Sequence, residues 1–377
     1  MKRFLKILLP GMAAVFFSAA QLPAQSGHLL SVKGFVDSYH AIRTEAPGDW
    51  MSSRTRVRGE FRLEKDGGGI FLSSNLVYNA LLKDQSGFQL REAYAFWGNS
   101  SWDIRAGKQI ITWGVADGLR VTDLISPMDY TEFLAQDYDD IRVPVGALRV
   151  RYAHASWTLE GVAVPVAEFF KLPVDPANPW SVGPLPPEMK PESTVKNMEF
   201  GARFSCFLRG VDFSLMALRT WNKMPELAAD HLDYHRLTVI GGDLSVPVGK
   251  FVFRAEMADN IHQNGDHQGN ALGGVDWYPG ADWNLSVQFN RTFGAGQSQS
   301  LATLRASKAL LNNALTLSTF TYADVLSPGV FNRFSVDWTA TDQIHVILGY
   351  DYFYAKEGMF ALYARNSEAW LKLKYSF

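Results

Sequence analysis

Residues 53–64 read Ser-Arg-Thr-Arg-Val-Arg-Gly-Glu-Phe-Arg-Leu-Glu, and two kinds of side chain alternate along the whole stretch. Every even-numbered position is Arg or Glu, whereas the odd-numbered positions include Val57 and Phe61. A period of two places successive side chains on opposite faces of a β-strand. Residues 53–64 therefore predict a strand with one charged face and one largely apolar face.

The same alternation recurs down the chain, for example over residues 283–290 and 344–351. Short turn-forming stretches separate some of these segments, at residues 65–68, 98–100, 153–155, 247–249, 279–281 and 340–342. Longer polar stretches separate the others, near residues 44–52, 80–87, 114–145, 165–194, 220–233, 259–269, 292–299, 322–329 and 353–365. Tight turns that alternate with long loops are typical of transmembrane β-barrels.

We therefore expect an all-β fold, a transmembrane antiparallel β-barrel of about 18 strands, with 16 as the fallback. The short turns should face the periplasm and the long loops the cell exterior. A helical membrane protein is excluded, because beyond the N-terminus no run of ~20 apolar residues occurs. Aromatic residues make up 13 % of the chain, which suits the lipid face and the two interfacial girdles of a barrel.

The first 24 residues have the pattern of a secretory signal peptide, with basic residues at positions 2, 3 and 6 and an apolar stretch over 7–20. We expect cleavage after Ala24 and a single barrel domain over residues 25–377. Loss of the three basic residues takes the formal net charge from -2 to -5. A mildly acidic mature protein argues against a nucleic-acid partner.

The C-terminal stretch alternates in the same way from about Asn366 and ends on Phe377, with Tyr375 two positions earlier. This ending resembles the C-terminal signal of bacterial outer-membrane barrels. The resemblance implies that the barrel-insertion machinery recognises the last strand, and that outer-membrane lipid surrounds the barrel in the cell outer membrane.

The third long loop carries an unusual concentration of acids, seven against two bases. Its candidate residues are Asp117, Asp123, Asp129, Glu132, Asp137, Asp139, Asp140 and Arg142. A long loop after an early strand of a barrel this size can fold inward and narrow the channel, where carboxylates would favour cations. The alternative is an acidic, solvated external loop. Within the third long loop, Ser126 and Pro127 predict the start of a short helix over residues 126–134.

Arginines recur on the polar faces of the early strands, at Arg54, Arg56, Arg58, Arg62, Arg91, Arg105, Arg149 and Arg151. If these faces line the lumen, the arginines form a basic wall that can bind carboxylate, phosphate or sulfate. The alternative is that they pair with nearby acids such as Glu60 and Asp103 and fill a polar interior. The fourth long loop holds eight of the 17 prolines, and we expect an exposed, irregular surface loop there. The alternative is that it caps the outer mouth or folds over the channel.

Residues 107–114, Gly-Lys-Gln-Ile-Ile-Thr-Trp-Gly, are followed by Asp117, Asp123, Pro127-x-Asp129 and Arg142-x-Pro144. This arrangement resembles a segment of an uncharacterised family of porin-like outer-membrane β-barrels, in which a Gly-Lys-Gln…Trp-Gly strand precedes a long acidic loop. The resemblance implies a single large barrel and a transport role.

Motifs of enzymes are missing from the sequence. It contains no Gly-x-Ser-x-Gly, phosphate-loop or zinc pattern, and the single Cys206 allows neither an internal disulfide nor a cysteine metal cluster. We expect no catalytic activity, no cofactor and no bound metal. The sequence thus predicts a porin that passes small solutes passively, with a non-conducting barrel for surface binding or assembly as the alternative.

Overall fold

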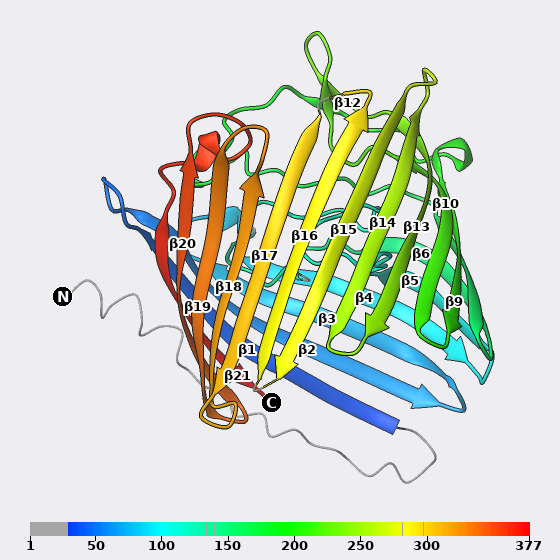
Figure 1. The fold of residues 1–377 in the computed structure, drawn as a ribbon, viewed down its shortest axis with the longest axis horizontal. Helices are drawn as coiled ribbons and strands as arrows, with labels where there is room; N and C mark the ends of the chain where they lie inside the picture. Colours follow the sequence, from blue (N-terminus) through cyan, green and yellow to red (C-terminus); the bar gives the residue numbers. More distant parts are fainter. Residues whose placement is uncertain (1–28, 133, 139, 281, 297) are drawn as a thin grey trace.

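The computed structural model describes residues 29–132, 134–138, 140–280, 282–296 and 298–377. The proposed signal peptide therefore lies outside the described residues. Eighteen strands form one antiparallel sheet (Figure 1). They are β1 Leu29–Arg43, β2 Trp50–Lys65, β3 Gly68–Asn79, β4 Gly87–Gly98, β5 Trp102–Gln109, β6 Val145–His154, β7 Trp157–Val164, β9 Glu199–Leu208, β10 Val211–Trp221, β13 Arg236–Val248, β14 Phe251–His262, β15 His267–Gly280, β16 Trp283–Gly294, β17 Gln299–Leu310, β18 Leu315–Asp324, β19 Gly329–Thr341, β20 Ile344–Ala355 and β21 Glu368–Ser376.

The sheet closes on itself because β1 pairs with β2 on one side and with β21 on the other. Beyond the last strand, Gly34 and Phe377 exchange two backbone hydrogen bonds of 2.9 Å, so the C-terminal residue also joins the seam. Closure leaves no free sheet edge, which every barrel in a membrane requires. The prediction of an antiparallel barrel of 18 strands is confirmed.

One end of the barrel, here called the turn end, carries the six predicted tight turns and two further ones at residues 209–210 and 311–314. The opposite end, the loop end, carries the longer connections. Three predicted long loops are wrong in length, since only residues 263–266, 295–298 and 325–328 lie between the strands there. The strands β14 to β19 continue through stretches rich in polar residues, because their ladder hydrogen bonds extend to the rim of the barrel.

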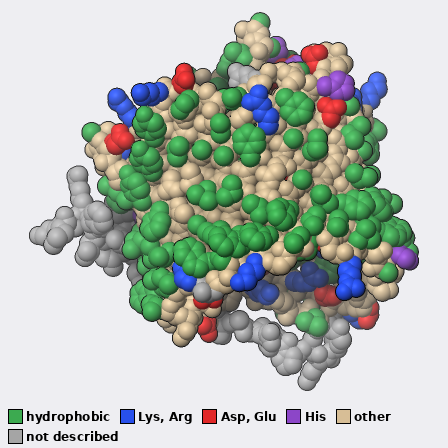
Figure 2. Space-filling view, viewed as in Figure 1, with side chains coloured by type: hydrophobic (Ala, Val, Ile, Leu, Met, Phe, Trp, Pro, Cys, Tyr) green, Lys and Arg blue, Asp and Glu red, His purple; other side chains and the backbone are tan. Residues whose placement is uncertain are grey.

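The outer face of the barrel is apolar around its middle. Figure 2 shows hydrophobic side chains across this band, with most of the Lys, Arg, Asp and Glu side chains above and below it. Large outward side chains such as Leu215, Met257 and Leu348 are each more than half exposed. Since the alternate positions point inward, the period of two read from the sequence is the alternation between the outer and inner faces.

The remaining elements are short and lie in the loops. The strands β8 Glu188–Met189, β11 Glu226–Leu227 and β12 Leu232–Asp233 form a small three-stranded sheet at the loop end. The 3-10 turns are η1 Lys83–Gln85, η2 Val195–Asn197 and η3 Ala361–Tyr363. In the described part of the chain, no helix is both long and apolar enough to cross a membrane.

The proline-rich loop, residues 165–198, is largely exposed over residues 184–196, as expected, whereas its first half folds over the mouth of the barrel. Its Phe169 and Trp180 side chains are 6 % and 3 % exposed. Phe169 packs on Tyr234, and Trp180 packs on Phe353 of β20, on the far side of the barrel from β7. The loop therefore reaches across the mouth, because one of its aromatic side chains packs on the connection that leads into β13 and the other packs on β20.

Candidate functional site

The candidate site is built around residues 110–144, here called the inner segment, which connects β5 to β6. Its side chains and backbone contact strands on all sides of the barrel. The contacted residues are Glu256 on β14, Gln288 on β16, Arg305 on β17, Tyr322 on β18, Arg333 on β19, Lys372 on β21, Arg56 and Arg58 on β2, and Arg91 on β4. A segment that binds opposite walls lies inside the barrel, as the ribbon in Figure 1 also shows.

Glu256 fixes the first half of the inner segment. Its Oε1 accepts hydrogen bonds from the backbone N–H groups of Val115 and Ala116, and its Oε2 accepts from the N–H (3.2 Å) and the hydroxyl (3.0 Å) of Thr122. The side chain is 1 % exposed. Four donors satisfy a buried carboxylate that would otherwise be costly in the barrel interior.

An apolar cluster inside the barrel also holds this half of the segment. Ile111, Trp113, Val121 and Ile125 pack against inward-facing side chains of the wall. Those wall residues are Val145, Ala147, Val162, Val164, Met216, Leu218, Leu237, Val239, Ala258 and Leu272. One side of the interior is therefore apolar at the loop end, which the charged faces of the early strands did not predict.

Each acid of the inner segment that the structure describes has a polar partner. Three of the acids pair with cations of the wall, namely Asp117 with Arg305 (2.5 Å), Asp137 with Lys372 (2.9 Å) and Asp140 with three arginines. Two pair with cations of the loops, Asp123 with Arg142 (2.9 Å) and Asp129 with Lys171 (3.1 Å). Glu132 accepts hydrogen bonds from Asn79 (2.7 Å) and Ser52 (3.3 Å). Asp139 lies outside the described residues. The negative charge of the segment is thus largely balanced by the wall and by its own arginines.

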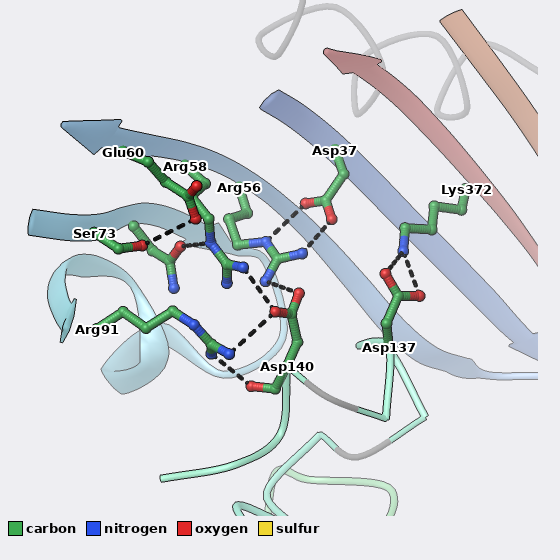
Figure 3. Close-up of polar contacts among 10 residues, drawn as sticks. Asp37, Arg56, Arg58, Glu60, Ser73, Arg91, Asp137, Asp140 and Lys372 are labelled. Atoms are coloured by element: carbon green, nitrogen blue, oxygen red, sulfur yellow. Dashed lines mark hydrogen bonds and ion pairs between the residues drawn. The ribbon is translucent and has the colours of Figure 1, made fainter. Parts of the chain in front are cut away.

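The three arginines around Asp140 form what we call the arginine cradle, residues Arg56, Arg58 and Arg91 (Figure 3). Asp140 Oδ2 lies 3.0 Å from Arg56 Nη1, and Oδ1 lies 2.7 Å from Arg58 Nη1 and 3.3 Å from Arg91 Nη2. Arg91 Nη1 also donates to the backbone carbonyl of Asp140 at 2.8 Å. One carboxylate is therefore held by three guanidinium groups from two strands.

Local backbone structure brings these arginines together. Arg56 and Arg58 occupy successive inward positions on β2. Arg91 is the extra residue where the register between β3 and β4 shifts, because Ser73 pairs with Glu92 and Ser74 with Leu90. A bulge of this kind redirects a side chain, and here it turns Arg91 toward β2.

Burial and neighbouring charges shift the pKa values of three acids of the inner segment. Burial by itself would raise the pKa of Asp140, but Arg56, Arg58 and Arg91 hold that pKa well below its usual range. Lys372 likewise outweighs burial and lowers the pKa of Asp137. Burial raises the pKa of Glu132, although Arg54 and the hydrogen bonds from Asn79 and Ser52 oppose it.

The other predicted arginines lie on the inner face but do not meet at one point. Arg54 is 5 % exposed and lies near Glu132. Arg62 pairs with Glu64 (3.0 Å), Arg105 with Asp103 (3.1 Å) and Arg149 with Glu160 (2.6 Å), whereas Arg151 is exposed. The neutralising pairs expected as the alternative to a basic wall thus form on β2, on β5 and between β6 and β7, separately from the cradle on β2 and β4.

The predicted helix over residues 126–134 is wrong. Met128 instead forms a bridge with Arg142, and Asp129 forms one with Lys171 of the proline-rich loop. The backbone N–H of Asp129 donates to Ile141 at 2.6 Å, and that of Tyr130 donates to Lys171 at 2.8 Å. Pairing with two extended segments replaces the hydrogen bonds that a helix would have supplied.

Several residues of the site were not among the sequence candidates, namely Asp37, Glu160, Glu256, Arg305 and Lys372. Each is an inward-facing charged residue in a strand that alternates, so the period of two placed it on the correct face. Nothing in the spacing told which part of the inner segment would reach it. Among the described residues, no group of three or more His, Cys, Asp or Glu side chains is placed to hold a metal ion.

Residues 42–265 match the model of a family described as protein of unknown function, DUF1302. The chain belongs to this family. The matched range includes β2 to β14 and the whole inner segment. No curated protein matches the chain in sequence.

Solved porin structures share the fold of this DUF1302 member. OccK2 (OpdF) of Pseudomonas aeruginosa, in complex with glucuronate, is 10 % identical with a TM-score of 0.60, over 92 % of this chain and 97 % of that one. OccK11 (OpdR) of the same organism is 8 % identical with a TM-score of 0.58, over 92 % and 96 %. OccAB3 of Acinetobacter baumannii is 9 % identical with a TM-score of 0.57, over 92 % and 99 %. At these identities the likeness is one of fold.

Proposed function

We propose that the protein is an outer-membrane porin that lets small solutes pass passively, and that the inner segment is its constriction. The observation that carries the proposal is the exposure of charged side chains inside the barrel. Asp117 and Asp137 are bound to β17 and β21 of the wall, yet their side chains are 38 % and 64 % exposed. Water that reaches these carboxylates marks a hydrated path beside the segment.

The outer surface supports a membrane location. A band of apolar side chains surrounds a barrel whose backbone groups are paired around the whole circumference, which is the combination that a bilayer demands. We place the barrel in the outer membrane with its turn end toward the periplasm, and we propose that the insertion machinery recognises the strand that ends at Phe377. The Occ structures support the channel assignment through their fold.

Planar-bilayer recording tests the proposal. The purified protein should insert and give discrete conductance steps, and Asp137→Asn should shift the reversal potential in a salt gradient toward anions. Glu357→Gln, a change at an exposed loop residue, is the matched control. Insertion without conductance steps would overturn the porin assignment, and an unchanged reversal potential would remove Asp137 from the pore.

A non-conducting barrel for surface binding or assembly is the second candidate. It is favoured by the apolar clusters at the loop end, where Trp113 and its neighbours fill one side of the interior and Trp180 closes part of the mouth. Insertion without conductance, in a protein whose barrel is folded by circular dichroism, is the result that this candidate requires.

A further inference from the structure

We propose that the arginine cradle is a binding site for oxyanionic solutes, and that Asp140 occupies it as a tethered competitor. The ligand would carry a carboxylate or a phosphate group. This inference rests on the proposed function, since it names the class of solute that the constriction would bind.

Two of the three arginines of the cradle, Arg56 and Arg58, are held by partners on the wall. Asp37 holds Arg56 through two contacts, at 2.5 and 3.1 Å. Asn75 accepts a hydrogen bond of 2.8 Å from Arg58 Nε. These partners lie on β1 and β3, so the two guanidinium groups keep their places when Asp140 leaves. A site that is already formed binds an incoming anion without the cost of ordering its side chains.

The chemistry of the cradle matches any oxyanion of the right size. Each guanidinium group gives one nitrogen to the Asp140 carboxylate, and together the three groups contact both of its oxygens (Figure 3). Charge-assisted hydrogen bonds of this kind bind carboxylate and phosphate alike. Arg58 is 5 % exposed, and in the described part of the chain its Nη2 has no hydrogen-bond partner. A donor is therefore available that the Asp140 carboxylate does not use, and a phosphate with more oxygens would engage it.

Asp140 can leave while the rest of the inner segment stays in place. The four hydrogen bonds to Glu256 hold residues 115–122, and Asp123 pairs with Arg142 inside the segment. The part that must move is the arm that ends at Asp140 and begins near residue 134. Among its described residues, the wall contacts beyond the cradle include Arg333 to the Leu134 carbonyl and Lys372 to Asp137. Exchange of Asp140 for a solute anion would thus widen the passage locally.

Calorimetric titration of the detergent-purified, full-length barrel tests the inference without requiring conduction. The probes are gluconate, inorganic phosphate and sorbitol, which resembles gluconate in size but has no carboxylate. Wild-type protein should bind gluconate or phosphate weakly, and Arg58→Gln should lose that binding. Asp140→Asn should raise the association constant by at least about tenfold, because a tethered group competes at an effective concentration in the millimolar range. Sorbitol should bind to none of the variants.

Glu357→Gln is the matched control, since it removes a carboxylate at an exposed loop residue outside the inner segment. It should change the association constants less than twofold. Equal gains in Glu357→Gln and Asp140→Asn, or no gain in Asp140→Asn with the barrel still folded, would overturn the inference. If Asp140→Asn does not fold, Arg58→Gln alone tests the inference. An Arg58→Gln variant that binds gluconate or phosphate as strongly as the wild type would then overturn the inference. If the variants bind anions as expected but the protein gives no conductance, the porin proposal is contradicted and the inference about the cradle is not.

Discussion

Glu256, on β14, binds Thr122 twice, through the backbone N–H at 3.2 Å and through the side-chain hydroxyl at 3.0 Å. The two residues are 134 positions apart in the chain. The contact joins the inner segment to the wall opposite the arginine cradle. The segment is therefore fixed from two sides, by a buried carboxylate of the wall at one end and by a carboxylate of its own at the other.

Glu256→Gln should loosen the first half of the inner segment. In either orientation the amide NH₂ group faces two of the four donors, those of Val115 and Ala116 or those of Thr122, from which it cannot accept. Hydrogen bonds to a charged group contribute about 1.5–3 kcal/mol each. We expect the free energy of local opening to fall by about 2–4 kcal/mol, measured by native-state proteolysis of the segment. The control Glu357→Gln should leave the cleavage rate unchanged, and equal cleavage in the two variants would contradict the role of Glu256.

Acid should release the arm that carries Asp140. Because the folded-state pKa of Asp140 is lowered, its ion pairs stabilise the arm fully above the ordinary aspartate range, about pH 4, and this contribution is lost as the pH falls through the folded-state value. We expect single-channel conductance to increase and become noisier on going from pH 7 to about pH 3. The double variant Asp137→Asn, Asp140→Asn should show a much flatter response, and an identical pH response in that variant would refute this mechanism.

Glu132 should respond to pH with the opposite sign. Burial raises its folded-state pKa, so the folded state holds the proton more tightly than the unfolded state does. Stability is therefore lost as the pH rises from the ordinary glutamate range, about 4.3, toward the folded-state value. Glu132→Gln keeps an acceptor for Asn79 or Ser52 and should remove this loss, as measured by urea unfolding over a pH series. If the free energy of unfolding of Glu132→Gln has the same pH dependence as that of the wild type, Glu132 does not have a raised folded-state pKa.

A charged substitution on the outward face should destabilise the barrel more near the middle of a strand than in a turn at the turn end. Leu348 is 56 % exposed on β20, while Leu311 is 74 % exposed in a turn at the turn end. Leu348→Arg should lower the free energy of unfolding in lipid vesicles by about 2–4 kcal/mol, whereas Leu311→Arg should change it by less than about 1 kcal/mol. Equal effects of the two substitutions would mean that Leu348 does not face the hydrocarbon region.

The alternation of side chains determined the strands, their inner and outer faces, and with the turn pattern the strand number of 18. These features are local, since a period of two and a tight turn each act over a few residues. The inward arginines could be identified for the same reason. Strand ends at the loop end were less predictable, because ladder hydrogen bonds rather than side-chain polarity decide where β14 to β19 stop.

Only the tertiary structure decided what the acids of the inner segment do. Closure of the barrel through the pairing of β1 with β21 brings Lys372 to Asp137, 235 positions away, and places Arg305 beside Asp117, 188 positions away. The register shift that turns Arg91 into the cradle is likewise a product of pairing between two strands. Sequence by itself determined that the segment is acidic. The partners of those acids depend on which walls the closed barrel brings within reach, and a local pattern holds no information about that.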